Sequence, residues 1–500
     1  MMFHLENIQK AYKIAYKHAR CAFEHKEYNK VFHWCRVCAQ IAYQVNWIYC
    51  DDEIENLLVA VAEDEIKVNS LVPNPERICF YDAFFLDYRG LSLQYLRALL
   101  AAGKEVLVVC QNPLLDNSAA MQEELRENPR CHIVTLPPGQ NSVERMHTIY
   151  SHITNFAPTA LLMHLEPFSV EAIAAFSALR GVKRCQINLT DHAFWLGVKC
   201  LDFSLEFRNY GCTVSLEKRG IPADKIKLLP YYPVTGKEPF AGFPLPTTGK
   251  VIVVSGAVSY KIMGKNDTFF HLVKDILEQN PNVVFFFAGG GNLNKFKRFL
   301  QRHKLENRCG FLGARRDINE VIAHCDIYLA TYPITGGLMS QYAAANGKPI
   351  LAWNSSDLPI NNLEEFVCIH RKTHLTITDF NEFSAEARHL VDDCNYRHER
   401  GELLRNAMEN REYFEKNVAE FLLSGNTLYS WDTEPIPYSD FTDLYLSVAS
   451  NEVDTLKKIL LKNFGIHTIK MIPEIFWEMP VLVWYYFAKK KIDLLIKREK

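Results

Sequence analysis

The stretch that decides the fold is DIYLATYPITGGLMSQYAAANGKP, residues 326–349. It opens with an apolar run typical of a strand covered on both faces, and the run ends at Tyr-Pro, residues 332–333. Gly336 and Gly337 predict a tight turn from which a helix begins at once, and Asn-Gly at 346–347 is typical of a helix C-terminus. Unpaired N–H groups and the helix dipole make such a helix start attractive to anions, and glycines let a diphosphate approach closely. An ordinary junction without a ligand has the same pattern, so the segment alone leaves both interpretations open.

The same alternation of strand and helix extends on both sides of this segment. Between 76 and 189 and between 251 and 353, short β-branched or aromatic runs alternate with amphipathic helical stretches. Their continuous apolar character is typical of parallel strands with helices on both faces. Four prolines and three glycines between 231 and 249 interrupt the series and predict a domain boundary. We therefore expect an α/β protein with two doubly wound lobes and a cleft between the carboxyl ends of their strands.

Helical patterns flank the two lobes. The N-terminal residues carry two apolar stripes at helical spacing, which predict one tetratricopeptide-like hairpin or a plain helical cap. Residues after about 373 return to helix. The predicted organisation is a helical cap at 1–72, a first lobe at 76–232, a second lobe at 249–372 and a helical tail at 373–500.

Composition and charge narrow the classes of function. The chain is 48% hydrophobic with a net charge of -2, and it lacks the basic excess typical of nucleic-acid binders. Its N-terminus does not have the pattern of a signal peptide, and no run approaches the roughly 20 apolar residues of a membrane span. We expect a cytoplasmic protein that does not bind nucleic acid.

The 14 cysteines fit a reducing compartment, where free cysteine behaves as a small buried hydrophobe. Cys35 and Cys38 have CxxC spacing, but no second ligand pair follows at the spacing of a zinc site. In a helix these two residues share a face. Buried packing is therefore the favoured interpretation, and metal or redox chemistry is the alternative.

Two further features of the second lobe suit a bound anion. Lys261 follows the apolar run at 251–256, and Gly290 lies in a glycine turn after the apolar run at 283–288. A solvated surface charge is the alternative interpretation of Lys261, and Lys265 is its reserve candidate. Glycine turns are common, so Gly290 indicates little by itself.

Residues 326–349 resemble the donor loop of glycosyltransferase family 41, the O-linked N-acetylglucosamine transferases and their bacterial N-glucosyltransferase relatives. The residues in register with the family pattern are Asp326, Ile327, Leu329, Thr331, Tyr332, Pro333, Gly336, Gly347 and Pro349. The setting of Lys261 in 254–262 is similar to that of the family's lysine. The chain departs from the family at Thr335, where the family has Asn, and at Tyr342, where it has the acid that holds the donor ribose. Leu338 and Met339 replace its phosphate-binding hydroxyls, and the double-glutamate pattern of retaining family 4 enzymes is also missing.

The resemblance implies the GT-B fold and transfer of a sugar from a nucleotide-diphosphate donor, with a UDP-sugar favoured. It implies an inverting reaction in which Lys261 neutralises the departing diphosphate. Gln341 or a residue elsewhere has to supply the ribose contact. The chain contains no Asp-x-Asp motif, which suits a site without a metal ion and with no other cofactor. The predicted donor-binding residues are Lys261, Thr335, Gly336, Gly337, Ser340, Gln341 and Gly290.

The general base is expected on the first lobe. His192 beside Asp191 lies where a strand should end at the cleft, and a histidine oriented by a carboxylate suits proton abstraction. His164 beside Glu166 is a similarly placed rival. A structural role is the more common one for a lone histidine. Residues 87–90 are a candidate contact for the acceptor.

Two other functions fit the same pattern. A sugar-nucleotide 2-epimerase shares the two-lobed architecture, and a non-catalytic nucleotide-binding or scaffold protein would explain the lost ribose acid. The acceptor of a transferase could be a protein, a glycan or a lipid-linked molecule. The basic, aromatic C-terminus at 481–500 suits peripheral contact with the inner membrane face, although a solvated last helix is the favoured interpretation.

Overall fold

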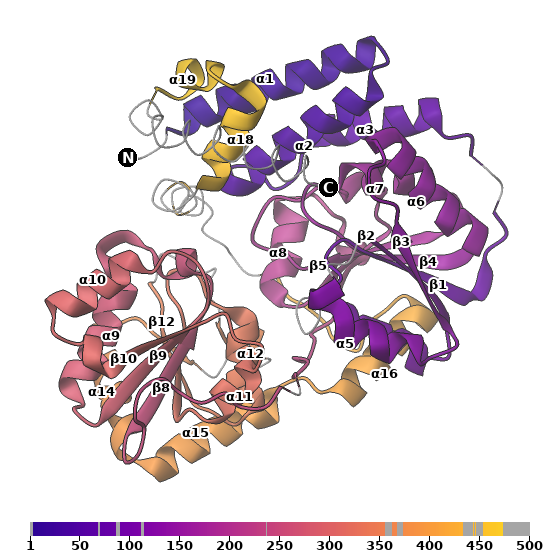
Figure 1. Ribbon diagram of the computed structural model, residues 1–500. Helices are drawn as coiled ribbons and strands as arrows, with labels where there is room; N and C mark the ends of the chain where they lie inside the picture. Colours follow the sequence, from indigo (N-terminus) through magenta and orange to yellow (C-terminus); the bar gives the residue numbers. More distant parts are fainter. Residues whose placement is uncertain are drawn as a thin grey trace, which may run out of the picture.

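Two α/β lobes and a helical region make up the computed structural model (Figure 1). The structure describes residues 4–68, 71–86, 91–111, 115–236, 238–355, 363–367, 374–433, 444, 446 and 454–473. Both lobes contain a parallel sheet with helices on its two faces, and helices lie at both ends of the described chain. The predicted α/β fold of two doubly wound lobes with flanking helices is confirmed.

The first lobe is built on a seven-stranded sheet in the order β3-β2-β1-β4-β5-β6-β7. Every pairing in this sheet is parallel. The strands are β1 Asn74–Asp82, β2 Glu105–Gln111, β3 Cys131–Leu136, β4 Pro158–His164, β5 Lys183–Asn188, β6 Phe203–Glu206 and β7 Ile226–Leu228. The helices are α4 Ser92–Ala101, α5 Leu115–Arg126, α6 Ser142–Phe156, α7 Val170–Ser177 and α8 Asn209–Glu217. Strand order reverses between β1 and β4, which is where ligands bind in open parallel sheets.

The second lobe repeats the arrangement with six parallel strands in the order β10-β9-β8-β11-β12-β13. The strands are β8 Val251–Gly256, β9 Val283–Ala288, β10 Cys309–Gly313, β11 Ile327–Leu329, β12 Ile350–Trp353 and β13 Thr376–Ile377. The helices are α9 Thr268–Gln279, α10 Asn294–Arg302, α11 Ile318–Ala323, α12 Gly337–Ala345 and α13 Leu363–Phe366. Strand β9 is buried along its whole length, because helices cover both faces of the sheet, and this explains its uninterrupted apolar sequence.

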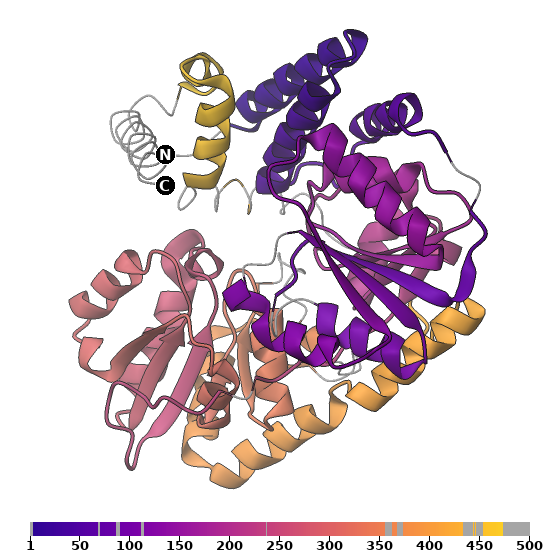
Figure 2. The same cartoon turned by 45° about the vertical axis from the view of Figure 1, so that its right-hand side comes forward.

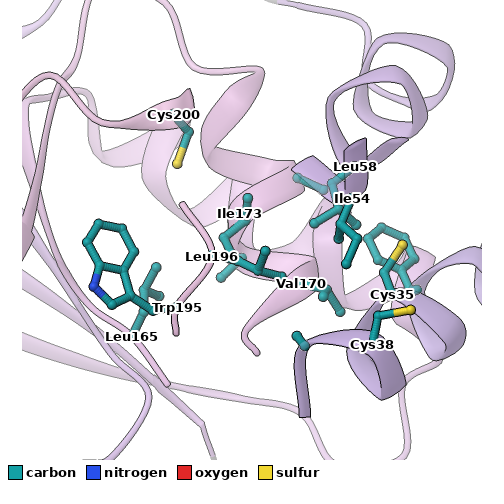
Figure 3. Close-up of a cluster of buried hydrophobic side chains, with 14 of the residues drawn as sticks. Cys35, Cys38, Ile54, Leu58, Leu165, Val170, Ile173, Trp195, Leu196 and Cys200 are labelled. Carbon is teal, nitrogen blue, oxygen red and sulfur yellow. The ribbon is translucent and has the colours of Figure 1, made fainter. Parts of the chain in front are cut away.

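The N-terminal helices α1 Leu5–Glu24, α2 Tyr28–Val45 and α3 Asp52–Glu65 pack on the first lobe. Figure 3 shows Cys35 and Cys38 of α2 in the resulting apolar cluster, together with Ile54 and Val170. Both cysteines are completely buried, as the packing interpretation requires. Within the described ranges, no three His, Cys, Asp or Glu side chains gather as a metal site.

The C-terminal helices divide among three parts of the molecule. Helix α14 Phe380–Asp392 packs in the core of the second lobe, and α15 Cys394–Ala407 follows it. Helix α16 Arg411–Ser424 crosses to the first lobe and packs on α4. Helices α18 Asp454–Phe464 and α19 His467–Met471 lie beside α1 and α2, so both ends of the described chain meet there (Figures 1 and 2). The single tail predicted at 373–500 is therefore split in space.

The segment at 481–500, for which a solvated last helix is favoured over membrane contact, lies outside the described residues. None of the described helices combines the length and the apolar character that crossing a bilayer requires.

Candidate functional site

The segments that follow the carboxyl ends of β5 and β8 bring together side chains of the two lobes. His192 follows β5 of the first lobe, Lys261 follows β8 of the second, and the two side chains are close enough for the lysine charge to lower the histidine pKa. The candidate site lies where these segments meet.

The turn between β11 and α12 forms one wall of the site. The Thr331 hydroxyl donates to the carbonyl of Ile334 at 2.8 Å and accepts the N–H of Gly336 at 3.0 Å, so one side chain fixes the whole turn. Helix α12 then begins at Gly337. The predicted end of this helix is also present, because Asn346 is its C-terminal cap and Gly347 has φ 63°.

Three other predicted donor-binding residues, in the turn and the start of α12, are buried: Thr335, Ser340 and Gln341. The Ser340 hydroxyl bonds back to the carbonyl of Gly336 at 3.3 Å, so it supports the turn from inside the protein. Gln341 Nε2 donates to the carbonyl of Phe366 at 3.0 Å. Gln341 Oε1 and Thr335 Oγ1 have no hydrogen-bond partner among the described residues, and both atoms are shielded from solvent. Such atoms are costly to bury unless a ligand or water completes them.

Lys261 is half-buried in the short helix η3 Ser259–Ile262. Its ammonium group donates to the carbonyl of Thr335 at 3.3 Å, which joins it to the α12 turn. Burial, and then the charge of Arg208, lower the pKa of Lys261 to about 8. No carboxylate is among the groups that shift this pKa or among the recorded partners of Lys261 in the described chain. The lysine therefore brings a positive charge to the start of α12, with no carboxylate partner among the described residues.

A glycine turn after β9 lies beside the loop that carries Lys261. Gly289 has φ 150°, and a Cβ built on it would lie 1.8 Å from the carbonyl oxygen of Ala257. Only glycine fits this close approach of two backbones. The N–H of Ser259 donates to the carbonyl of Gly290 at 2.9 Å, while a Cβ on Gly290 would meet nothing within 4 Å. The turn is thus held tightly at Gly289 and is open at Gly290.

The first lobe contributes an ordered acid–base pair. His192 Nδ1 lies 3.2 Å from Asp191 Oδ1, and the histidine side chain is 30% exposed. Asp191 is buried and accepts two hydrogen bonds from Arg208, at 2.5 and 3.0 Å. Burial alone would raise the pKa of Asp191, but the Arg208 guanidinium holds it well below its ordinary value. Burial lowers the pKa of His192 despite Asp191, so the imidazole is neutral near pH 7.

His164 occupies a different position, within the interior of the first lobe. It ends β4, has no exposed surface, and lies 3.0 Å from Asp82 Oδ1 and 3.2 Å from Ser92 Oγ through the same Nδ1 atom. Of the two candidate histidines, only His192 is partly exposed, and the charge of Lys261 acts on its pKa. Residues 87–90, the candidate acceptor contact, lie outside the described residues, as does the side chain of the reserve lysine Lys265.

Arg208 and Phe366 are part of the candidate site although no sequence motif indicated them. Arg208 lies two residues after β6, with its guanidinium carbon 4.0 Å from the ring centroid of Phe366. A charged residue directly after a buried strand was the available signal for Arg208. Phe366 had no comparable signal, because its role depends on contacts with residues distant in the chain.

The second lobe matches a known family. Residues 249–393 match the family model described as Glycosyl transferases group 1. A comparison with curated proteins finds no match.

Several solved structures are similar in fold. Anabaena HepE in complex with UDP and glucose has 15% identity and a TM-score of 0.50, over 70% of this chain and 100% of that chain. S. aureus TarM, crystallised with UDP among its ligands, has 8% identity and a TM-score of 0.51 over the same shares. A mutant Thermobaculum terrenum O-GlcNAc transferase has 13% identity and a TM-score of 0.50, over 84% of this chain and 78% of that chain. The chain therefore has the GT-B fold, and its second lobe matches the group 1 glycosyltransferase family over residues 249–393.

Proposed function

We propose that this protein is a glycosyltransferase that takes a sugar from a nucleotide-diphosphate donor, with UDP as the favoured nucleotide. The observation that carries the proposal is the half-buried ammonium of Lys261. It has no carboxylate partner among the described residues, and it donates to the carbonyl of Thr335, two residues before helix α12 begins. A fixed positive charge beside the start of a nine-residue helix suits the diphosphate of such a donor. The group 1 match of the same lobe supports this assignment.

The proposed donor site surrounds that charge. The N–H group of Gly337 and the hydroxyl of Thr335 would bind phosphate oxygens, and the open side of Gly290 would admit the donor. Gly336 would shape the turn, because its N–H is already donated to Thr331. Gln341 Oε1 would accept a hydrogen bond from the ribose, in place of the missing acid at Tyr342. Ser340 would stabilise the turn through its hydrogen bond to the carbonyl of Gly336.

In the proposed reaction, His192 removes the proton of an acceptor hydroxyl as the acceptor oxygen bonds to the anomeric carbon. The bond between that carbon and the diphosphate oxygen breaks, and its electron pair leaves with the nucleotide. Lys261 stabilises the charge that develops on the diphosphate, without a metal ion in this proposal. Attack from the side opposite the leaving group inverts the anomeric carbon. The neutral state of His192 near pH 7 and its contact with Asp191 support its role as the base.

The family 41 relationship is a finer proposal, which rests on the motif at 326–349 and the setting of Lys261. A screen of protein, glycan and lipid-linked acceptors is the experiment that identifies the acceptor class.

The test is a calorimetric titration with UDP, GDP, dTDP and CMP, repeated on Lys261→Ala. We expect one nucleoside diphosphate to bind, and we expect its affinity to fall tenfold or more in the variant, about 1.4 kcal/mol. Folded protein that binds none of the four would refute the proposal. Chromatography of the matching nucleotide-sugar, incubated with the protein and no acceptor, then separates transfer from epimerisation, since only an epimerase converts it to an isomer.

A further inference from the structure

Phe366 belongs to the second lobe by sequence but packs against the first lobe. Its ring stacks on Phe207 with centroids 5.8 Å apart and planes at 30°, and it contacts the apolar core of the first lobe. The guanidinium of Arg208 lies over the same ring at 4.0 Å. Next to it, Glu365 accepts the N–H of Tyr210 at 2.8 Å. Helix α13 is therefore anchored to the first lobe at two successive residues.

The same phenylalanine also contacts the proposed donor turn. A Cβ built on Gly337 would lie 2.5 Å from the Phe366 ring, so the ring rests directly on the backbone of the first residue of α12. The carbonyl of Phe366 accepts the amide of Gln341 from the second turn of that helix. Any displacement of the α12 start must therefore move Phe366 or break these contacts.

Arg208 extends this chain of contacts to the proposed base. It is buried, as is Asp191, and its two hydrogen bonds fix the carboxylate that faces His192. Its remaining nitrogen, Nη1, has no hydrogen-bond partner within the described residues. The orientation of the guanidinium therefore depends on Asp191 on one side and on aromatic faces, including that of Phe366, on the other.

We infer that Phe366 and Arg208 are positioning residues that couple the donor turn of the second lobe to the Asp191–His192 pair of the first. The inference rests on the proposed function, because it assigns the turn to the donor and His192 to the base. Binding at the α12 start would be transmitted through the ring to the guanidinium and then to the carboxylate that orients His192. The base would be correctly oriented only when the two lobes are joined through Phe366.

The decisive measurement is the NMR titration of His192, assigned by the loss of its signal in His192→Gln. Among the described residues, Asp191, Arg208 and Lys261 are charged groups that act on the pKa of this imidazole. We expect Phe366→Leu, which keeps an apolar side chain but removes the ring, to move the His192 pKa toward its ordinary value in protein without nucleotide. We expect Phe366→Tyr, which keeps the ring, to retain the wild-type titration. Phe380→Leu is the matched control, because Phe380 is a half-exposed phenylalanine of the same lobe at the start of α14.

A UDP titration then tests the coupling itself. In wild-type protein we expect UDP to change the His192 signal, and in Phe366→Leu we expect UDP to bind while the signal no longer responds. Arg208→Lys keeps the charge without the paired, stacked geometry, and we expect it to lose the response as well. An unchanged His192 titration in both variants would overturn the inference. If UDP does not bind at all, the proposed function fails, whereas the titrations without nucleotide still decide whether Phe366 positions the base.

Discussion

Lys261 gives the site a charge that is sensitive to pH. Its pKa is lowered to about 8, so the free protein loses this charge as the pH rises through that value. Only the protonated form attracts a diphosphate, and a bound diphosphate opposes loss of the proton. We therefore expect the Kd for UDP to increase by about tenfold or more between pH 7 and pH 9.5. Phosphate ionisation, with a pKa of about 6, is nearly complete over this range.

The variant Lys261→Arg is the control for that pH dependence, because arginine stays charged throughout the range. We expect calorimetry to give a nearly constant Kd for this variant. Wild-type protein with a constant Kd across the same range would show that the diphosphate does not bind at Lys261.

Gly289 and Gly290 are adjacent residues with opposite expected responses to alanine. In Gly289→Ala the new methyl group collides with the Ala257 carbonyl at a φ that only glycine adopts easily, so we expect loss of stability and of UDP binding. In Gly290→Ala the methyl group enters open space, so we expect the melting temperature to stay within about 2 °C of wild type. The donor is proposed to occupy that space. Weaker UDP binding by a fully stable Gly290→Ala protein would place the donor there, and unchanged binding would exclude Gly290 from the site.

At the residue scale, the sequence predicted the positions whose role is local. Gly336 and Gly337 fit the pattern of a turn that starts a helix, and Gly347 fits the pattern of a helix end. The structure has helix α12 between these positions. Phe366 was not predictable in the same way, because its contacts with Arg208 depend on the packing of two lobes. The sequence placed both His164 and His192 after apolar runs, and only packing shows that the first is buried.

At the element scale, helix α16 joins the two lobes physically. Phe414 is completely buried in the first lobe, with its ring 5.2 Å from Tyr95 and 5.7 Å from Tyr232, although α16 follows the second lobe in sequence. We expect Phe414→Ala to lower the free energy of unfolding by about 3–5 kcal/mol, because it leaves a cavity in that core. Urea unfolding followed by circular dichroism measures the loss.

The matched control on the same helix is Leu423→Ala. Leu423 is 85% exposed, so its substitution should change the free energy of unfolding by no more than about 0.5 kcal/mol. Equal effects of the two substitutions would mean that α16 does not dock on the first lobe in solution.

The positions of strands and helices along the chain were the most predictable feature of this structure. Each expected strand and helix between 251 and 353 is present, because strands buried on both faces and amphipathic helices have distinct patterns. The surfaces on which the C-terminal helices pack could not be predicted. Their periodicity indicates that one face is buried, but it does not indicate which surface covers that face, so α14, α16 and α18 could not be assigned to different parts of the molecule.

At the scale of the whole molecule, a buried carboxylate of helix α3 helps to attach the N-terminal helices to the first lobe, in addition to apolar packing. Glu55 of α3 accepts the N–H groups of Gly197, Val198 and Lys199 at 2.8, 3.2 and 2.7 Å. Burial raises the pKa of Glu55 to about 7, against the effect of these three hydrogen bonds. The turn at 197–199 follows the segment of His192, so this attachment also supports the proposed site.

Removing that carboxylate tests whether the helices and the lobe behave as one unit. In Glu55→Ala, three backbone N–H groups lose their acceptor in a buried environment, at about 1–3 kcal/mol for each group that water cannot reach. We expect a loss of about 3 kcal/mol or more in the free energy of unfolding, and faster hydrogen exchange at 197–199. Glu63→Ala on the exposed face of α3 should change neither quantity. If Glu55→Ala accelerates exchange only in the N-terminal helices, and not at 197–199, the helices are an independent module, and the position of His192 does not depend on them.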